Sequence, residues 1–150
     1  MRVVIQKVKR ASVKVNNQII SEIKYGLMIL VGYELDDTIE DITWLVNKII
    51  NLRIFNDHNN KMNLSLKDTD GDILLVSQFT LHASTKKGNR PSFINSLNPA
   101  EANQMYNITI KELEKSLEKK IKCGVFGELM DVELINNGPL TITIDSKKKE

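Results

Sequence analysis

The sequence predicts an α+β fold in which a curled or barrel-like, antiparallel-rich sheet packs against two main helices. Short β-branched or apolar segments, separated by turn residues, fill the first third of the chain and return near its end. Two stretches between them repeat apolar residues at helical spacing. The chain has 150 residues and shows neither a linker nor a short-period repeat, so we expect residues 1–150 to form one domain with a charged tail at 146–150.

Four strands are expected in the first third of the chain. Asn16-Asn17 and Tyr25-Gly26 divide this region as turns. Residues 27–31 are apolar throughout, which predicts a strand buried on both faces. The expected strands cover residues 2–8, 12–16, 18–23 and 26–33.

The two main helices each begin with a capping signal. Asp37 is the expected N-cap of the first helix, and Glu40 completes a capping box. Asn98 is the expected cap of the second helix, with Pro99 at the first helical position and Glu101 at the third. The first apolar stripe is Ile39, Ile42, Leu45, Val46, Ile49 and Leu52, and the second is Ala102, Tyr106, Thr109, Leu113 and Leu117.

Two strands are expected near the end of the chain, at residues 132–135 and 140–145. Asn136-Asn137-Gly138-Pro139 separates them. Asn-Gly favours a hairpin turn, but a proline directly after it removes a ladder donor and restricts the glycine. The last four residues, 147–150, are charged and are expected to be solvated and frayed.

Composition indicates a soluble globular protein, with 41% hydrophobic and 27% charged residues and a net charge of +2. The single cysteine, Cys123, cannot form an intrachain disulfide and is expected to be a small buried or half-buried side chain. Charges within the first nine residues do not fit a signal peptide, and no apolar run has the length of a membrane span. We therefore expect a cytoplasmic protein.

A buried strand is expected at residues 72–79, and it runs into Ser77-Gln78-Phe79-Thr80-Leu81. Polar residues at the end of a buried strand are a common place for a site, because backbone N–H groups that leave the ladder can stabilise an oxyanion. The alternative is a strand that ends in a polar turn with Phe79 in the core, and the pattern alone favours this alternative.

Two histidines and a basic loop are further candidates. His82 follows this segment and has the chemistry of a general base, but a triad also needs an orienting acid, and no G-x-S-x-G motif is present. His58 lies in an Asn/Asp-rich turn and is expected to be exposed. No cluster with metal-ligand spacing is found, so we expect neither a metal nor a cofactor. The loop at 82–93 carries three basic residues, Lys86, Lys87 and Arg90, that are suited to binding phosphates. The alternative is a solvated charged loop without a ligand.

Six segments of the chain resemble the D-aminoacyl-tRNA deacylases in order and spacing, from Met1 to about Asp145. These segments are MRVVIQKVKRASV, NLRIF, KMNLS, SQFTL, KKGNRPSF and NNGPLT. The resemblance implies a homodimer that hydrolyses the ester joining a D-amino acid to the terminal ribose of a tRNA. It also implies activity on glycine mischarged on tRNA-Ala, assistance by the 2′-OH of the tRNA, and no cofactor.

The resemblance also assigns site residues. The catalytic motif is matched by Ser77, Gln78, Phe79 and Thr80, with Thr80 lining the pocket or positioning water rather than attacking. Gly138 and Pro139 match a motif whose cis bond reaches into the pocket of the neighbouring subunit and leaves no room for an L side chain. Positions near the pocket are matched by Phe126 and Met130. The tRNA phosphates would be contacted by Lys86, Lys87 and Arg90.

Two departures from the family pattern bear on these expectations. Lys7 stands where relatives carry an arginine that supports the Gly-Pro loop. A lysine ammonium cannot donate the paired, planar hydrogen bonds of an arginine guanidinium, so it is a poorer support. Ser84 replaces the usual aspartate before the basic loop. Two other hypotheses compete with the editing esterase: a non-catalytic dimer that binds RNA or protein through the basic loop, and a general Ser/Thr esterase that uses His82.

Overall fold

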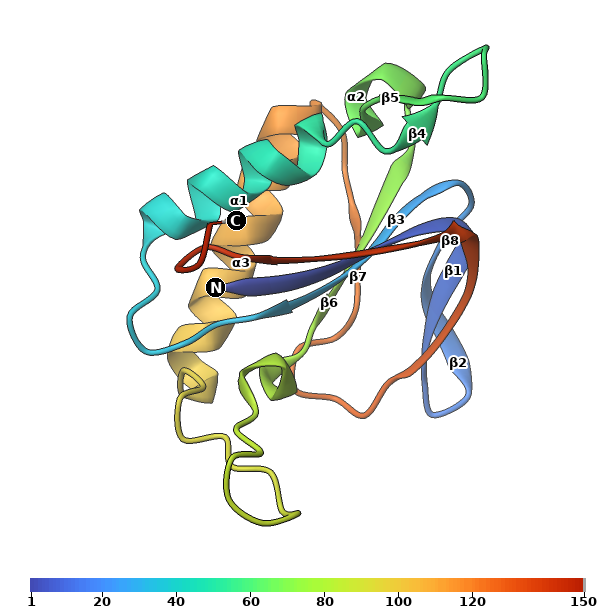
Figure 1. The fold of residues 1–150 in the computed structure, drawn as a ribbon. Coiled ribbons are helices and arrows are strands. Elements are labelled where there is room, and N and C mark those ends of the chain that lie inside the picture. Colours follow the sequence, from blue (N-terminus) through green and yellow to red (C-terminus); the bar gives the residue numbers. More distant parts are fainter. Residues whose placement is uncertain (150) are drawn as a thin grey trace.

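The computed structural model describes residues 1–149. A mixed six-stranded sheet lies at the centre, and the two long helices pack side by side against it (Figure 1). The strands are β1 (Arg2–Val15), β2 (Gln18–Ile23), β3 (Gly26–Gly32), β4 (Phe55–Asn56), β5 (Met62–Leu64), β6 (Asp72–Ser77), β7 (Lys122–Cys123) and β8 (Asp131–Asp145). The helices are α1 (Ile39–Asn51), α2 (Leu66–Thr69), the 3₁₀ helix η1 (Phe79–His82) and α3 (Pro99–Leu117).

Strand β1 organises the sheet, because both of its edges are paired. One edge pairs antiparallel with β3 and then with β2, and the other edge pairs antiparallel with β8. β6 joins β3 in parallel, and β7 joins β6 in parallel. The sheet curls until its ends meet, where Ser21 Oγ on β2 donates to the carbonyl of Cys123 on β7 at 2.7 Å. This barrel-like α+β fold with two main helices confirms the predicted fold class.

Two apolar cores hold the sheet in place. The larger core lies between the sheet and helices α1 and α3, and the smaller core lies inside the curl. Leu27 and Ile29 of β3 belong to the larger core, whereas Met28 between them belongs to the smaller core. The prediction that this strand is buried on both faces is therefore confirmed.

The two helix caps had different outcomes. The cap of α3 is confirmed, since Asn98 Oδ1 accepts from the N–H of Glu101 at 3.1 Å. The cap predicted for α1 at Asp37 and Glu40 is wrong by one residue. Thr38 is the N-cap, and its N–H donates to Asp41 Oδ2 at 2.9 Å. Asp37 instead accepts from the N–H of Glu34 and from the N-terminal ammonium group.

Several predicted strand boundaries change because of long-range pairing. The segments at 2–8 and 12–16 form the single strand β1, since Arg10 between them still pairs with Ile135 of β8. The Asn/Asp-rich loop expected at residues 56–60 is the turn that joins the two strands of a small sheet, β4–β5, with Asn56 as the last residue of β4. Helix α2 follows this sheet.

The strands predicted at 132–135 and 140–145 are the two halves of β8, and both pair with β1. Asn136–Pro139 is thus not a hairpin turn but a bulge, at which the β1–β8 register shifts near Val8. The Gly138–Pro139 peptide bond is cis, as predicted.

The side chain of Asn136 closes this bulge. Its Oδ1 accepts from the N–H of Leu140 at 2.8 Å. Its Nδ2 lies 3.3 Å from the carbonyl oxygen of Leu140 and 3.2 Å from Thr141 Oγ1, and donates to both. Hydrogen bonds within the same chain therefore hold the Gly138–Pro139 segment.

The start of the predicted tail is docked on the fold rather than frayed. Ser146 is buried, and its N–H donates to the carbonyl of Met1 at 2.9 Å. Lys147 Nζ lies 2.8 Å from Asp41 Oδ2. Lys148 and Lys149 are exposed, and Glu150 lies outside the described residues. Among the helices of residues 1–149, none is long and apolar enough to cross a membrane.

Candidate functional site

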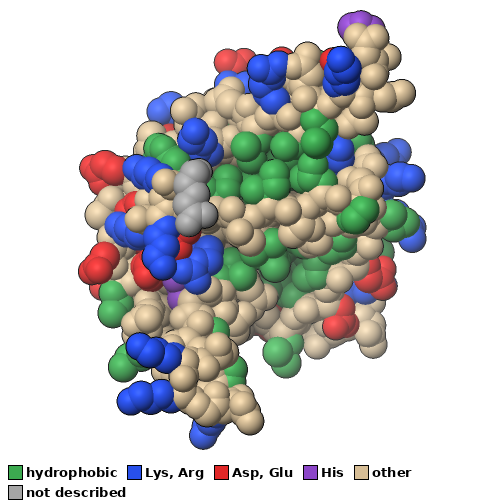
Figure 2. Space-filling model, in the orientation of Figure 1, with side chains coloured by type: hydrophobic (Ala, Val, Ile, Leu, Met, Phe, Trp, Pro, Cys, Tyr) green, Lys and Arg blue, Asp and Glu red, His purple; other side chains and the backbone are tan. Residues whose placement is uncertain are grey.

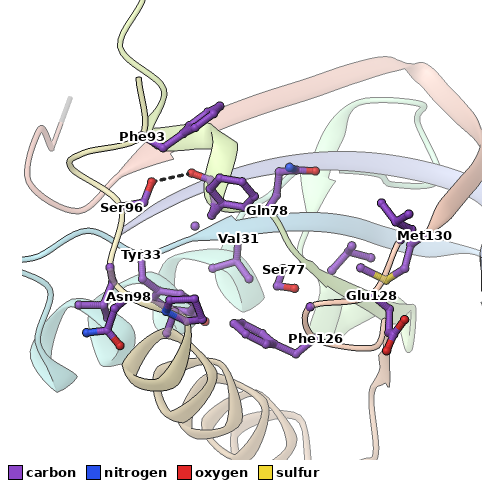
Figure 3. Close-up of a pocket in the computed structure, with 18 of the residues that line it drawn as sticks. Val31, Tyr33, Ser77, Gln78, Phe93, Ser96, Asn98, Phe126, Glu128 and Met130 are labelled. Carbon is purple, nitrogen blue, oxygen red and sulfur yellow. Dashed lines mark hydrogen bonds between the residues drawn. The ribbon is translucent and has the colours of Figure 1, made fainter. Parts of the chain in front are cut away.

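A cavity of about 670 Å³ lies where the parallel strands β3 and β6 end (Figure 3). The carboxyl ends of parallel strands are a common place for ligands, because loops diverge there and leave a crevice. Residues from the end of β3, the end of β6, the start of α3 and the β7–β8 connection line the cavity.

The sequence-predicted segment Ser77–Phe79 forms one wall of the cavity. The prediction of a strand to Phe79 is wrong by two residues, because β6 ends at Ser77 and the chain turns into η1. The N–H of Gln78 donates to the carbonyl of Val31 at 2.7 Å, which ties this turn to β3. Phe79 is 56% exposed, so the alternative that placed it in the core is wrong.

Thr80 takes part in the site indirectly. Its Oγ1 accepts a hydrogen bond from Gln78 Nε2 at 2.6 Å. Ser77 and Gln78 are half-buried and line the cavity, whereas Thr80 is not a lining residue. The hydroxyl of Thr80 is therefore placed to orient Gln78.

The β7–β8 connection supplies the opposite wall. Phe126 and Met130, both predicted from sequence, line the cavity there. The ring of Phe126 packs against Tyr106 of α3, with centroids 5.8 Å apart. Tyr106 is fixed in turn, because its hydroxyl donates to the carbonyl of Leu75 at 2.8 Å. Figure 3 shows the ring of Phe126 extending from the β7–β8 connection below Ser77.

Burial disfavours the ionised form of three side chains around the cavity. Burial raises the pKa of Tyr33 and of Tyr106 well above the usual range. Burial also raises the pKa of the Cys123 thiol to about 11, which does not suit a nucleophile that must ionise. Cys123 is half-buried, as expected.

His82 does not belong to the cavity. It is 4% exposed, and its ring packs on Gly32, where an added Cβ would lie 3.1 Å from His82 Cδ2. Its Nδ1 lies 3.8 Å from Glu34 Oε2, and its Nε2 has no hydrogen-bond partner among residues 1–149. No serine or threonine hydroxyl bonds to this imidazole in the described chain, so the geometry gives no triad. His58 is exposed, as predicted.

The three predicted phosphate ligands project from the molecule beside the cavity. Lys86, Lys87 and Arg90 are exposed in a loop that is closed by hydrogen bonds between Ser84 and Ser92. Figure 2 shows basic side chains on the lobe at the bottom of the molecule, where Figure 1 draws the segment between η1 and α3.

Gly138 and Pro139 are exposed and do not line the cavity of their own chain. Lys7, which stands in place of the family arginine, points elsewhere: its Nζ donates to the carbonyl of Ile54 at 3.0 Å and to Asn56 Oδ1 at 3.4 Å. Among the described residues, Asn136 rather than Lys7 supports the Gly138–Pro139 segment.

A family model described as D-Tyr-tRNA(Tyr) deacylase matches residues 4–145. The chain belongs to the D-Tyr-tRNA(Tyr) deacylase family. It is 57% identical over 150 residues to a D-aminoacyl-tRNA deacylase of Flavobacterium johnsoniae and 54% identical over 150 residues to one of Bacteroides fragilis, with all of each chain covered. A solved structure named c-Myc DNA Unwinding Element Binding Protein is 40% identical, with a TM-score of 0.91 over 97% of this chain and 98% of that chain.

Sequence reasoning missed several lining residues of this member of the D-Tyr-tRNA(Tyr) deacylase family. They are contributed by the end of β3 and by the segment that leads into α3: Tyr33, Phe93, Ser96, Asn98 and Ala102. For Tyr33 a signal was present, because β3 was expected to be buried on both faces, and such a strand ends at the same sheet edge as a parallel neighbour. Glu128, which carries the single charged side chain among the lining residues of the described chain, had no such signal.

Proposed function

We propose that this protein hydrolyses the ester bond between a D-amino acid and the terminal ribose of a tRNA. The observation that carries the proposal is identity over the full chain length to proteins named D-aminoacyl-tRNA deacylase. The convergence of Ser77–Phe79, Phe126 and Met130 on one cavity supports it, because these segments also carry the resemblance to the family. Residues 1–150 act together as one deacylase domain.

Catalysis rests on backbone donors and on the substrate rather than on a side-chain nucleophile. The backbone N–H groups of Phe79 and Thr80, just after β6 ends, stabilise the oxyanion that forms as water attacks the ester, while the N–H of Gln78 remains bonded to the carbonyl of Val31. The 2′-OH of the terminal ribose assists the attack. The burial of His82 outside the cavity supports this mechanism, and it disfavours a general esterase that uses this histidine.

Discrimination against L-amino acids comes from Gly138 and Pro139 of a second subunit. These residues enter the partner's cavity, where their carbonyls contact the α-ammonium and the backbone excludes an L side chain. Their exposure, and their position outside the cavity of their own chain, support a cross-subunit role. Glycine has no side chain to exclude, so glycyl-tRNA mischarged on tRNA-Ala is also a substrate.

The tRNA is held near the cavity by the phosphate contacts of Lys86, Lys87 and Arg90. Their exposure on a loop beside the cavity supports this role. The substrate is an RNA of the translation machinery, so we place the enzyme in the cytoplasm.

Three substrates offered side by side test the proposed function: D-Tyr-tRNA, L-Tyr-tRNA and a simple carboxylic ester. We expect loss of the D-acyl label alone. Turnover of the simple ester would indicate a general hydrolase, and no turnover of any substrate would indicate a binding protein. Replacing the terminal 2′-OH by hydrogen should abolish most of the activity, and full activity on the deoxy substrate would contradict assistance by the tRNA.

A further inference from the structure

Two phenylalanine rings lie exposed together at the rim of the cavity. Phe79 is 56% exposed and Phe93 is 36% exposed, and both line the cavity. Their ring centroids are 5.0 Å apart, with the ring planes at 68°. Ser96 Oγ donates to the carbonyl of Phe79 at 3.1 Å, which fixes the backbone beneath the pair. Apolar rings held in contact at an open position mark a binding surface.

The aromatic pair is continuous with the basic loop. Ser84 and Ser92 exchange two backbone hydrogen bonds of 2.8 and 2.9 Å, so residues 85–91 project as a closed loop. Phe93 is the first residue after this bridge. Exposed cations and exposed rings therefore stand on the same edge of the cavity mouth. Figure 3 shows the ring of Phe93 above the cavity, on the side opposite Phe126.

We propose that the Phe79–Phe93 pair is a stacking platform for the unpaired bases that precede the terminal nucleoside of the substrate RNA. The inference rests on the proposed function, in which the terminal aminoacyl nucleoside occupies the cavity. The preceding nucleotides of the single-stranded 3′ end then pass over the rim.

The chemistry of the rim fits single-stranded nucleic acid. Proteins that bind single strands combine cations that follow the backbone with aromatic rings that stack on bases. An edge-to-face pair leaves ring faces open to a third flat partner. Stacking is tolerant of base identity, so the platform holds the 3′ end without reading its sequence. A protein partner would not need the three cations on the adjoining loop, which is why an RNA occupant is favoured.

The test compares a full substrate with a minimal one. Phe93→Ala should raise KM for D-aminoacyl-tRNA roughly tenfold, the scale of one lost base–aromatic stack, with kcat little changed. D-aminoacyl-adenosine lacks the preceding nucleotides, so its KM should rise far less than the KM for D-aminoacyl-tRNA. Phe93→Trp keeps a stacking face and should restore the KM. Ile94→Ala is the matched control, because Ile94 is 78% exposed, directly follows Phe93 and does not line the cavity.

Equal losses on both substrates would overturn the proposal, since the ring would then support the cavity itself. An unchanged KM for D-aminoacyl-tRNA would overturn it as well. If Phe93→Ala changed the molecular mass measured by light scattering but caused no tRNA-specific change in KM, the pair would instead belong to a contact between protein chains.

Failure of the proposed function can be told apart from failure of the platform. An oligonucleotide that ends in the tRNA 3′ sequence but carries no amino acid can be used to measure binding by fluorescence anisotropy. This measurement requires no hydrolysis. Binding that weakens roughly tenfold in Phe93→Ala and not in Ile94→Ala supports the platform even if no ester is cleaved. Equal binding by the unaltered protein and Phe93→Ala contradicts the platform.

Discussion

Thr80 carries the hydroxyl that most invites assignment as a nucleophile, but its surroundings favour an orienting role. Its Oγ1 accepts from Gln78 Nε2, and no imidazole bonds to it in the described chain. Thr80→Ala should therefore keep kcat within roughly tenfold, because only an orienting hydrogen bond is lost. Rates on D-Tyr-tRNA would check this. A fall of about a thousandfold or more, as when a triad member is removed, would identify a nucleophile.

His82 is expected to matter for stability and not for chemistry. The ring is buried against Gly32, so His82→Ala leaves a cavity and should lower the free energy of unfolding by about 2 kcal/mol. Urea unfolding measures this loss. The rate per folded molecule should be nearly unchanged, with His58→Ala, an exposed site, as the control for both measurements. An inactive but fully folded His82→Ala protein would contradict this role.

Asn136 links the fold to the selectivity proposed for Gly138 and Pro139. Asn136→Ala removes three hydrogen bonds that hold the bulge. Hydrolysis of D-Tyr-tRNA should fall roughly tenfold, since neutral hydrogen bonds each contribute about 1 kcal/mol and part of the loss is recovered by relaxation. The D-to-L rate ratio should fall too, which a general loss of stability would not cause. Asn103→Ala is the control and should leave the D-to-L rate ratio unchanged. The same unchanged ratio in Asn136→Ala would show that Asn136 has no part in selectivity.

At the scale of elements, the loop at 85–91 should govern affinity. Neutralising Lys86, Lys87 and Arg90 should raise KM for D-aminoacyl-tRNA and flatten its dependence on salt, because fewer counterions are released on binding. The kcat should change little. Neutralising the exposed Lys24, Lys111 and Lys115 gives the same change of charge at other places. An equal effect in this control would show that the loop is only a solvated charged surface. An unchanged salt dependence of KM in the loop variant would show the same.

The docked end of the chain should stabilise the fold in a pH-dependent way. Burial acts to raise the pKa of Asp41, but hydrogen bonds from Lys147, Ser146 and Thr38 outweigh it and hold the pKa well below its usual range. A depressed carboxyl pKa stabilises the fold above the unfolded pKa of about 3.9, and this contribution is lost as pH falls below it. Lys147→Ala should therefore destabilise the protein by about 1 kcal/mol at pH 7 and by less at pH 3. Equal losses in unfolding experiments at both pH values would contradict the ion pair.

Local signals predicted elements well, and long-range pairing decided what they missed. The cap and stripe of α3 follow from neighbouring residues, and both are present as predicted. The continuity of β1 and β8 depends on pairing between residues more than 115 positions apart, which no local pattern encodes. Phe79 looked like a core residue because apolar residues precede it, but the turn after Ser77 directs it outward. The cavity itself appears only when β3, β6, α3 and the β7–β8 connection meet.

At the scale of the whole molecule, β8 favours a dimer. It is a 15-residue strand at the edge of the sheet, it has no fully buried residue, and its second edge is unpaired among residues 1–149. Long unpaired edges are templates for association, and a two-fold axis would make two equivalent sites. Light scattering should give twice the mass of one chain under active conditions. A monomer of full activity would contradict the cross-subunit site.

Chiral selectivity is the most direct test of the whole proposal, because it depends on the cavity, the oxyanion donors and the partner's Gly138–Pro139 segment at once. Single-turnover deacylation of D-Tyr-tRNA and L-Tyr-tRNA, prepared on the same tRNA, measures it. We predict rapid loss of the D-tyrosyl label while the L-tyrosyl label stays at its uncatalysed rate. Comparable hydrolysis of both, or protection of both, would contradict a D-aminoacyl-tRNA deacylase with this site.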